Sequence, residues 1–410
     1  MSKPEADGAG QPELAGIRIA YVVTSALTAT HLLRGQLGYL SSQGLEVALI
    51  CAPEEELSSF ADREGIALEP VPLRREISPW RDLVSLVALF RKLGSLRPDC
   101  VNVSTPKAGL LGLLAARALK IHVRIYTVRG LRLETTRGLK RWVLAKAEKT
   151  ALRCATNVIC VSSSLRKRLI ELQLAPADKL RILGSGSSNG VDHLRFSCPP
   201  ADKTILALRQ DLGLEESDNV VGFVGRLTRD KGLGDLVAAF DLIRQSHPSC
   251  KLLVIGDLEE GDSLSAELMS RLAEDSRIIL RSWANNIEEY YPLMDVLAFP
   301  SHREGFPNAP LEAACAQVPA VGYHVTGTVD AIVDGVTGGL VDGGNIEALA
   351  ASIARYLDEP DLRRLHGKHA RQRVIEEFQR EMVWKGLLDE YSRLFARFRA
   401  TREEDGKKRA

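Results

Sequence analysis

The chain has 410 residues, of which 45% are hydrophobic and 26% charged, a composition typical of a globular protein long enough for two domains. Its seven cysteines form no C-x-x-C pair and residues 1–15 hold no apolar core, which argues against a zinc site and against a signal peptide. The formal net charge of +1 conceals an asymmetry, because residues 1–198 carry a net +10 and residues 199–410 a net −9.

The first half of the chain alternates short β-branched runs with longer amphipathic stretches. Strands are expected at 17–23, 45–51, 100–104, 123–128 and 157–162, with helices at 30–43, 79–96, 107–120 and 138–155. This alternation predicts a parallel α/β domain over 16–198, preceded by a disordered N-terminus, 1–15. The segment "GSGSSNGVD", 184–192, indicates a flexible joint because seven of its nine residues are Gly, Ser or Asn.

The same rhythm restarts after the joint. Further strands are expected at 220–225, 251–256, 277–282, 295–301 and 319–323, within a second domain, 199–375. The fold class is therefore α/β, with two Rossmann-like, doubly wound domains facing a cleft, where ligands of such sheets usually bind. An amphipathic helix over 376–399 is expected to cross back to the first domain, and the charged tail 400–410 to be disordered.

Two common nucleotide-binding signatures are missing. The turn after the first expected strand reads "VVTSALTATHLL" and lacks the glycines of G-x-G-x-x-G, which argues against a hydride-transfer enzyme. The sequence also lacks G-x-x-x-x-G-K-[ST], which excludes a P-loop kinase or ATPase.

The stretch "GRLTRDKG", 225–232, places Arg226 and Lys231 between an expected strand and the start of the next helix. Two cations beside a helix N-terminus suit a diphosphate, since the amides and the side chains all attract negative charge. The alternative interpretation is a pair of solvated surface charges.

The stretch "FPSHREGFPNAPLEA", 299–313, carries two carboxylates separated by a turn. Pro307 and Pro310 exclude a continuous helix between Glu304 and Glu312, so the second helix is expected to begin near Asn308, a plausible N-cap. Carboxylates accept hydrogen bonds from hydroxyls, whereas cations and backbone amides hold phosphates. This inventory suits a nucleoside diphosphate sugar. The alternative is a surface loop followed by a helix with an acidic first turn.

Together, "GRLTRDKG", "FPSHREGFPNAPLEA" and the "SSNGVD" joint resemble the family 4 retaining glycosyltransferases, which have the two-domain GT-B architecture. The stretches "STPKAGLLGLLAARAL" and "VRIYTVRGLRLE" resemble the branch that builds bacterial surface polysaccharides, and the resemblance runs from about residue 16 to 398. It implies catalytic roles at the donor for Arg226, Lys231 and Glu304. It further implies a donor-binding set, with the base near Gly256: Gly305, Phe306, Pro307, Asn308, Glu312, Arg281 and Trp283.

One departure concerns the first domain. Many relatives have a histidine where this chain reads Thr127-Val128-Arg129-Gly130. Arginine cannot act as a base, but it can contact a sugar hydroxyl or an acceptor phosphate, so Arg129 is a candidate for the acceptor side. The alternative for Arg129 is a structural ion pair. Lys107 is a second acceptor-side candidate. The sequence has no Asp-x-Asp pair for a metal, and we expect neither a metal nor another cofactor.

The segment 129–153 carries eight Lys and Arg against two Glu, with Leu139, Trp142 and Val143 on one helical face. Such a surface suits anionic headgroups. The expected protein is cytoplasmic, attached peripherally to the inner face of the cytoplasmic membrane. Its expected partners are a nucleotide-sugar donor and a polyprenyl-diphosphate-linked acceptor, without nucleic acid. Transfer to a soluble small molecule and epimerisation of a sugar nucleotide are the alternatives.

Overall fold

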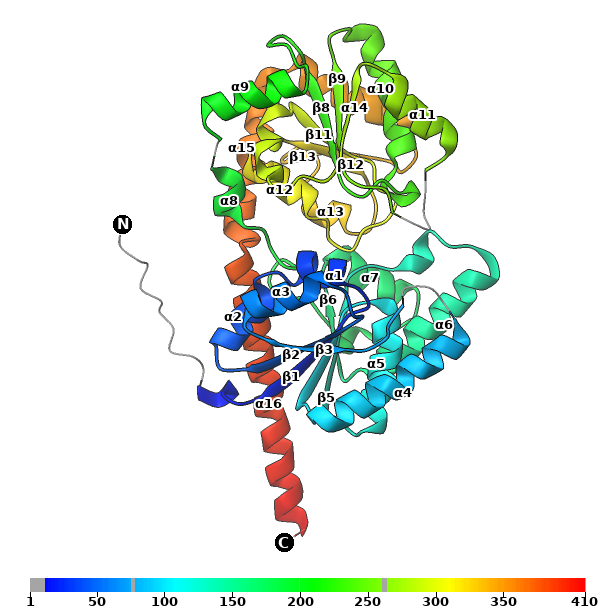
Figure 1. The fold of residues 1–410 in the computed structure, drawn as a ribbon, viewed down its shortest axis with the longest axis vertical. Helices are drawn as coiled ribbons and strands as arrows, with labels where there is room; N and C mark the ends of the chain where they lie inside the picture. The colour runs from blue at the N-terminus through cyan, green and yellow to red at the C-terminus, as the bar shows by residue number, and fades with distance from the viewer. Residues whose placement is uncertain (1–11, 75–77, 199, 260–263, 410) are drawn as a thin grey trace, which may run out of the picture. The chain divides into compact units, whose positions relative to one another are not determined.

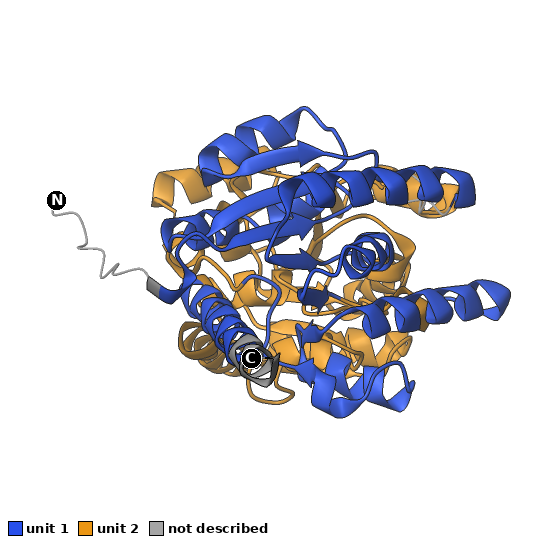
Figure 2. Ribbon diagram, turned by 90° about the horizontal axis from the view of Figure 1, so that it is seen from below, with its two compact units in different colours: residues 1–129, 136–189, 381–410 blue, residues 130–135, 190–380 orange. Residues whose placement is uncertain are grey.

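The computed structural model describes residues 12–74, 78–198, 200–259 and 264–409. The chain divides into two compact units (Figure 2): unit 1 comprises 1–129, 136–189 and 381–410, and unit 2 comprises 130–135 and 190–380. The chain thus passes into the second unit after Asn189, whereas the sequence placed that boundary at 198. The predicted cleft between the two domains stays a prediction.

The described residues of unit 1 form a seven-stranded parallel sheet in the order β3-β2-β1-β4-β5-β6-β7 (Figure 1). Its strands are β1 (Arg18–Val22), β2 (Glu46–Cys51), β3 (Ala67–Pro70), β4 (Cys100–Val103), β5 (Val123–Val128), β6 (Asn157–Cys160) and β7 (Leu180–Arg181). The five strands expected from β-branched runs are confirmed. The edge strands β3 and β7 carry no such run and were not predicted.

Helices connect these strands. They are η1 (Pro12–Leu14), α1 (Ala26–Leu32), α2 (Gln36–Ser42), α3 (Glu56–Glu64), α4 (Pro79–Leu96), α5 (Pro106–Ala118), α6 (Gly138–Cys154), α7 (Ser163–Glu171), η3 (Ala177–Lys179) and α16 (Arg380–Arg409). The single helix predicted over 30–43 is wrong, because the chain breaks at Gly35, which has φ +76°. A Cβ there would lie 2.6 Å from the Trp384 ring, so only glycine fits this left-handed position under α16.

The two chain ends also differ from the predictions. The disorder expected for residues 1–15 does not extend to η1, where Leu14 is fully buried; residues 1–11 lie outside the described residues. At the other end, α15 stops at Glu377 and α16 begins at Arg380, so the single helix predicted over 376–399 is wrong. The tail predicted as disordered continues α16 to Arg409.

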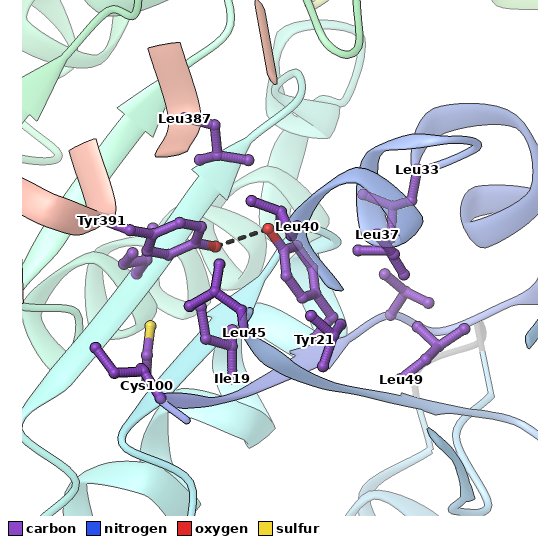
Figure 3. Packing of buried hydrophobic residues seen from close by; sticks show 14 of the residues in the cluster. Ile19, Tyr21, Leu33, Leu37, Leu40, Leu45, Leu49, Cys100, Leu387 and Tyr391 are labelled. Atoms are coloured by element: carbon purple, nitrogen blue, oxygen red, sulfur yellow. Dashed lines mark hydrogen bonds between the residues drawn. The ribbon is translucent and has the colours of Figure 1, made fainter. Parts of the chain in front are cut away.

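Helix α16 completes the core of unit 1. The Tyr391 hydroxyl lies 2.7 Å from the Tyr21 hydroxyl of β1, among buried leucines and Ile19 (Figure 3). Asn102 of β4 donates to the same Tyr391 oxygen at 2.8 Å and accepts from Thr127 of β5 at 3.0 Å. Three neighbouring strands and the C-terminal helix are therefore tied by one buried polar network, whose partners satisfy each other.

The described residues of unit 2 form a six-stranded parallel sheet in the order β10-β9-β8-β11-β12-β13. Its strands are β8 (Val220–Val224), β9 (Lys251–Ile255), β10 (Ile278–Arg281), β11 (Val296–Phe299), β12 (Ala320–Tyr323) and β13 (Gly338–Val341). Its helices are η2 (Arg132–Glu134), α8 (His193–Ser197), α9 (Asp202–Asp211), η4 (Arg229–Lys231), α10 (Leu233–Ser246), α11 (Ala266–Glu274), η5 (Ile287–Glu289), η6 (Tyr291–Leu293), α12 (Ala309–Cys315), α13 (Thr328–Ala331), α14 (Ile346–Asp358) and α15 (Pro360–Glu377). Two parallel sheets confirm the predicted α/β class.

The segment predicted as a flexible joint is not solvated where it leaves unit 1. Ser187, Ser188 and Asn189 are each only 7% exposed. The Asn189 side-chain oxygen accepts hydrogen bonds from Gln36 at 3.1 Å and from Trp384 at 2.7 Å. The polar composition that suggested a loose linker instead serves buried hydrogen bonds.

Candidate active site

Arg226 and Lys231 both follow β8, at the carboxyl edge of the second sheet. Arg226 comes two residues after the strand ends, and Lys231 is the last residue of η4. The next residue, Gly232, has φ +70°, and a Cβ there would lie only 2.0 Å from the Pro300 carbonyl oxygen. This close approach needs glycine and brings the turn after β8 against the loop after β11.

An ion pair between Lys231 and Glu304 joins these two loops. Lys231 Nζ lies 2.5 Å from Glu304 Oε1, and the Ser301 hydroxyl donates to the same carboxylate oxygen at 2.7 Å. The two charged side chains are only 15% and 11% exposed. The structure therefore brings together two predicted catalytic residues, in surroundings where the Coulomb attraction is weakly screened.

Asp230, which was not among the predicted site residues, lies at the centre of the cations at this edge. Thr228 donates to Asp230 Oδ1 at 2.7 Å, and Arg303 donates to Oδ2 at 2.7 Å. Burial raises the pKa of Asp230, but the Thr228 hydrogen bond and the charges of Arg303, Lys231 and Arg226 outweigh it, so the pKa is lowered overall. An ionised Asp230 thus holds Arg303 in place. Asp230 lies in "GRLTRDKG" and Arg303 in "FPSHREGFPNAPLEA", and this location was the only sign of them in the sequence.

Arg226 is in a different environment from Lys231. It forms an ion pair with Glu259, and its side chain is 44% exposed. An ion pair this exposed contributes little to stability, about 0–1 kcal/mol, and can exchange partners readily.

The helix after the loop begins where the prolines predicted. Helix α12 starts at Ala309, and Glu312 lies in its first turn, as expected. The Tyr291 hydroxyl donates to Glu312 Oε2 at 2.6 Å. Burial raises the pKa of Glu312, and the Tyr291 hydrogen bond and the Arg195 charge only partly oppose this. Sequence reasoning missed Tyr291, which lies in η6, because no motif marks it.

The predicted N-cap position of Asn308 is confirmed. Asn308 occupies the N-cap position of α12, but its side chain makes no capping hydrogen bond. Its Oδ1 atom is buried and, among the described residues, has no hydrogen-bond partner. A buried amide oxygen without a partner is costly, and a ligand donor would satisfy it.

The loop between Glu304 and Glu312 is held in place by buried side-chain packing. Gly305, Phe306 and Pro307 are buried, and the Phe306 ring packs 5.1 Å from the ring of Phe378, which is fully buried. The Phe306 side chain is therefore part of the core, and only the backbone of this residue remains as a group for a donor.

The residues expected around a base lie at the ends of neighbouring strands. Arg281 ends β10, and its guanidinium donates to the Asp211 carboxylate and carbonyl oxygens, both at 2.9 Å. Gly256, just after β9, donates to the Arg281 carbonyl at 3.0 Å. The Trp283 amide donates to Asp257 Oδ1 at 3.1 Å, and its side chain is 38% exposed. The Arg281 guanidinium is thus engaged by protein groups, whereas the Trp283 ring is accessible.

The two acceptor-side candidates lie in unit 1. Arg129 follows β5, donates to the Ser188 carbonyl at 2.8 Å and lines a small cavity with Asn102 and Thr127. Burial lowers the pKa of Arg129 to about 10. Within the described part of the chain it makes no ion pair, so the described residues give no support to the alternative of a structural ion pair. Lys107, by contrast, is held by Asp82 of α4 at 2.7 Å.

Comparisons with known proteins give the family. The family model "Glycosyl transferases group 1" matches residues 205–373, and "Glycosyl transferase 4-like domain" matches residues 28–186. The capsular polysaccharide biosynthesis glycosyltransferase CapM of Staphylococcus aureus is 36% identical over 375 residues, which cover 92% of this chain and 97% of that protein. The chain belongs to the group 1 glycosyltransferases. This glycosyltransferase is also 27% identical, over 83% of its length and 87% of the relative, to the UDP-Gal:alpha-D-GlcNAc-diphosphoundecaprenol alpha-1,3-galactosyltransferase of Escherichia coli.

The fold of the glycosyltransferase is confirmed as GT-B. The crystal structure of Anabaena Alr3699/HepE in complex with UDP superposes with a TM-score of 0.76 at 18% identity, covering 92% of this chain and all of that one. Among the described residues, no group of three or more His, Cys, Asp or Glu is arranged to hold a metal ion. Metal independence stays a prediction.

Proposed function

We propose that this glycosyltransferase is a retaining enzyme that moves a sugar from a uridine diphosphate sugar to a lipid-linked intermediate of a cell-envelope polysaccharide. Three similarities support the proposal. CapM is named for capsular polysaccharide biosynthesis, and the Escherichia coli relative is named for transfer from UDP-Gal to a diphosphoundecaprenol-linked sugar. The HepE structures hold UDP and UDP-glucose.

The observation that carries the proposal is the set of three cations, Arg226, Lys231 and Arg303, whose charges all act on Asp230. Arg303 is held by this aspartate, and we assign Arg226 and Lys231, whose own carboxylate partners are Glu259 and Glu304, to a diphosphate. The ammonium of Lys231 has three N–H donors, and Glu304 occupies one of them. The exposed pair of Arg226 with Glu259 can open, so that its guanidinium binds phosphate oxygens in a bidentate manner.

We assign the other parts of the nucleotide sugar, which are the transferred sugar, the ribose and the base, to the remaining groups of the site. Glu304 and the backbone of residues 305–308 hold the transferred sugar, and Glu312 accepts hydrogen bonds from the ribose hydroxyls, oriented by Tyr291. The buried Asn308 oxygen accepts a further donor from the ligand. The base lies against the strand ends at Gly256, with the accessible Trp283 ring beside it.

In the transfer step, the bond between the anomeric carbon and the diphosphate oxygen breaks, and its electron pair stays on that oxygen. The acceptor oxygen attacks from the same face and forms the new bond to the anomeric carbon. The acceptor proton passes to a leaving phosphate oxygen, so no protein nucleophile or base is required. Arg226 and Lys231 stabilise the charge that develops on the leaving group, a contribution of about 3–4 kcal/mol for a key contact.

Arg129 is the acceptor-side residue in this proposal. Its guanidinium is largely buried without a carboxylate partner in the described residues, and burying an unpaired charge is costly. An acceptor diphosphate supplies the missing counter-charge. Lys107 is a weaker candidate, because Asp82 already holds its ammonium.

A lipid-linked acceptor implies work at the inner surface of the cytoplasmic membrane. Helix α6 carries Lys140, Arg141 and Lys146, which we propose face anionic headgroups. No helix in the described ranges is both long and apolar enough to span a bilayer. A peripheral attachment is therefore the form of membrane contact that we propose.

A donor screen tests the proposal. Purified protein is incubated with UDP-, GDP- and dTDP-sugars, and both hydrolysis of the donor and the shift in melting temperature are measured. A short-chain polyprenyl-diphosphate sugar in detergent then serves as the acceptor. We expect a UDP-sugar to be selected and its sugar transferred with retained anomeric configuration, read by NMR of the product. Selection of another nucleotide, or inversion of the configuration, would contradict the proposal.

A further inference from the structure

Helix α4 presents an apolar stripe to solvent. Its exposed hydrophobic residues recur at helical spacing along 18 residues: Trp80, Leu83, Val84, Val87 and Phe90. Trp80 is 76% exposed, more than any core-facing role would allow. Exposed apolar residues are common singly, but five on one helical face form a patch of the kind that marks a binding surface.

A second stripe lies on α6, where Leu139, Trp142 and Val143 are exposed, with Leu139 at 77% and Trp142 at 59%. Helices α4, α5 and α6 each lead to the next strand in the same direction across the sheet, β4 to β5 to β6. Right-handed crossovers then place all three on one side of the sheet. Helix α5 packs against both α4 and α6 (Figure 1), so the two stripes flank it on a single surface, here termed the apolar face.

The charges of these three helices are almost all positive. Within their bounds they carry ten Lys and Arg and only two acids, Asp82 and Glu148. Asp82 is neutralised by Lys107 at 2.7 Å. Glu148 is buried against Tyr126, and burial raises its pKa to about 7, which keeps much of it protonated at neutral pH. Neither acid offsets the exposed cations.

We propose that the apolar face docks on an anionic lipid bilayer, with the α4 stripe inserted among the lipid headgroups and the cations of α6 at the lipid phosphates. The proposal rests on the proposed function only for the reason to visit a membrane; the surface itself is tested without donor or acceptor. Tryptophan favours the boundary between headgroups and acyl chains, and both stripes contain one. A second copy of the chain is a poor occupant, since two such faces would bring their cations together.

The proposal adds a component of binding that charge alone does not give. Contacts between exposed charges weaken as salt rises, because the screening length falls to about 3 Å at 1 M ionic strength. Burial of apolar side chains is not screened. Binding through α6 charges alone would vanish at high salt, whereas binding through the apolar face leaves a salt-resistant part.

The experiment compares three full-length proteins in co-sedimentation with vesicles of phosphatidylglycerol and phosphatidylcholine. The first is wild type. The second carries Leu83→Ser, Val87→Ser and Phe90→Ser on α4. The third is a matched control with two exposed leucines of unit 2 replaced, Leu206→Ser and Leu365→Ser, which are 67% and 49% exposed. Circular dichroism and urea unfolding check that the folds are equal. We expect the α4 variant to bind at least tenfold more weakly in 0.5 M salt, with the control equal to wild type.

Tryptophan fluorescence locates the contact. Of the four tryptophans, Trp384 is buried and Trp283 belongs to unit 2, so quenching by brominated lipids should come from Trp80 and Trp142. Changing both to phenylalanine keeps the apolar area and should abolish the quenching while vesicle binding persists. Quenching that persists in this variant would place the contact elsewhere and overturn the proposal.

The other possible outcomes also test whether the apolar face binds a membrane. Equal binding by wild type and the α4 variant, or no binding by either, rejects the apolar face. A wild-type dimer in analytical ultracentrifugation that the α4 substitutions dissociate would assign the face to a second copy instead. If vesicle binding fails while sugar transfer in detergent proceeds, the docking surface is wrong and the proposed function stands. If the protein binds vesicles but uses no nucleotide sugar, the docking surface stands and the proposed function is wrong.

Discussion

Replacing Lys231 by alanine should reduce both turnover and stability, whereas replacing Arg226 should reduce turnover alone. The difference comes from where the two cations sit. Lys231 and Glu304 form an ion pair with side chains 15% and 11% exposed, while the Arg226 side chain is 44% exposed. Both cations are proposed to face the same leaving diphosphate.

The magnitudes follow from those environments. Loss of a preorganised donor at the leaving group lowers turnover by about 10²–10³-fold. Removing Lys231 also leaves the Ser301 hydroxyl as the donor to the Glu304 carboxylate, and a lost hydrogen bond to a charged group is worth about 1.5–3 kcal/mol. Removing Arg226 breaks an exposed pair worth about 0–1 kcal/mol. We therefore expect unfolding free energies that differ by about 1–2 kcal/mol between the two variants.

The assay combines two measurements on each protein. Turnover is measured by release of the nucleotide diphosphate at saturating donor, and stability by urea unfolding without donor. A third variant, Lys231→Met with Glu304→Gln, removes both charges; it should recover much of the stability and none of the turnover. Wild-type turnover in either alanine variant would refute the diphosphate assignment, and equal destabilisation by both would refute the assignment of the buried pair.

Three further predictions concern the metal, the acceptor and a buried acid. Turnover should survive EDTA, because side-chain cations neutralise the leaving group; strict dependence on Mg²⁺ or Mn²⁺ would contradict this. Arg129→Gln should raise the KM for a diphosphate-linked acceptor at least tenfold, the size of effect expected for a lost hydrogen bond to a charged group. Donor hydrolysis should be unchanged. An unchanged acceptor KM would remove Arg129 from the acceptor site. Burial raises the pKa of Glu148 to about 7 from 4.5, so the folded state keeps a proton that the unfolded chain loses, and stability should fall as pH rises from 4.5 to 7. Glu148→Gln should abolish that fall, up to about 3 kcal/mol between pH 4.5 and 8 in urea unfolding, and an unchanged pH profile would contradict the burial of the acid.

The strands were predictable where side chains made a continuous buried run. Strands β4 and β8 are buried at every position, and the β-branched residues that achieve this are visible in the sequence. Strand β3 was missed because its residues are half-buried or exposed at the sheet edge, which leaves no apolar run to read. The break between α1 and α2 was missed for another reason. Gly35 lies against the ring of Trp384, which leaves no room for a side chain, and Trp384 is almost 350 positions away, so the local sequence carries no sign of it.

The sequence indicated which residues to consider for the candidate site, but not the contacts that they make. The prolines around Asn308 placed the start of α12 correctly, since proline restricts local backbone geometry. The burial of the Phe306 ring against Phe378 and the hydrogen bond from Tyr291 to Glu312 depend on segments far along the chain. Such tertiary contacts leave no spacing in the sequence that would predict them.

The pairing of Lys231 with Glu304 has a consequence for how the donor enters. Without a ligand, the cation that we assign to the diphosphate and the carboxylate that we assign to the sugar neutralise each other, so neither is an isolated charge in a shielded place. A nucleotide-sugar donor brings both phosphates and hydroxyls, so it can bind the Lys231 ammonium and the Glu304 carboxylate at the same time, without either side chain moving. A free nucleotide diphosphate offers the phosphates alone, and a free sugar the hydroxyls alone. On these assignments, we expect the ion pair to favour the intact donor over either of its halves, a preference that needs no residue beyond Lys231 and Glu304.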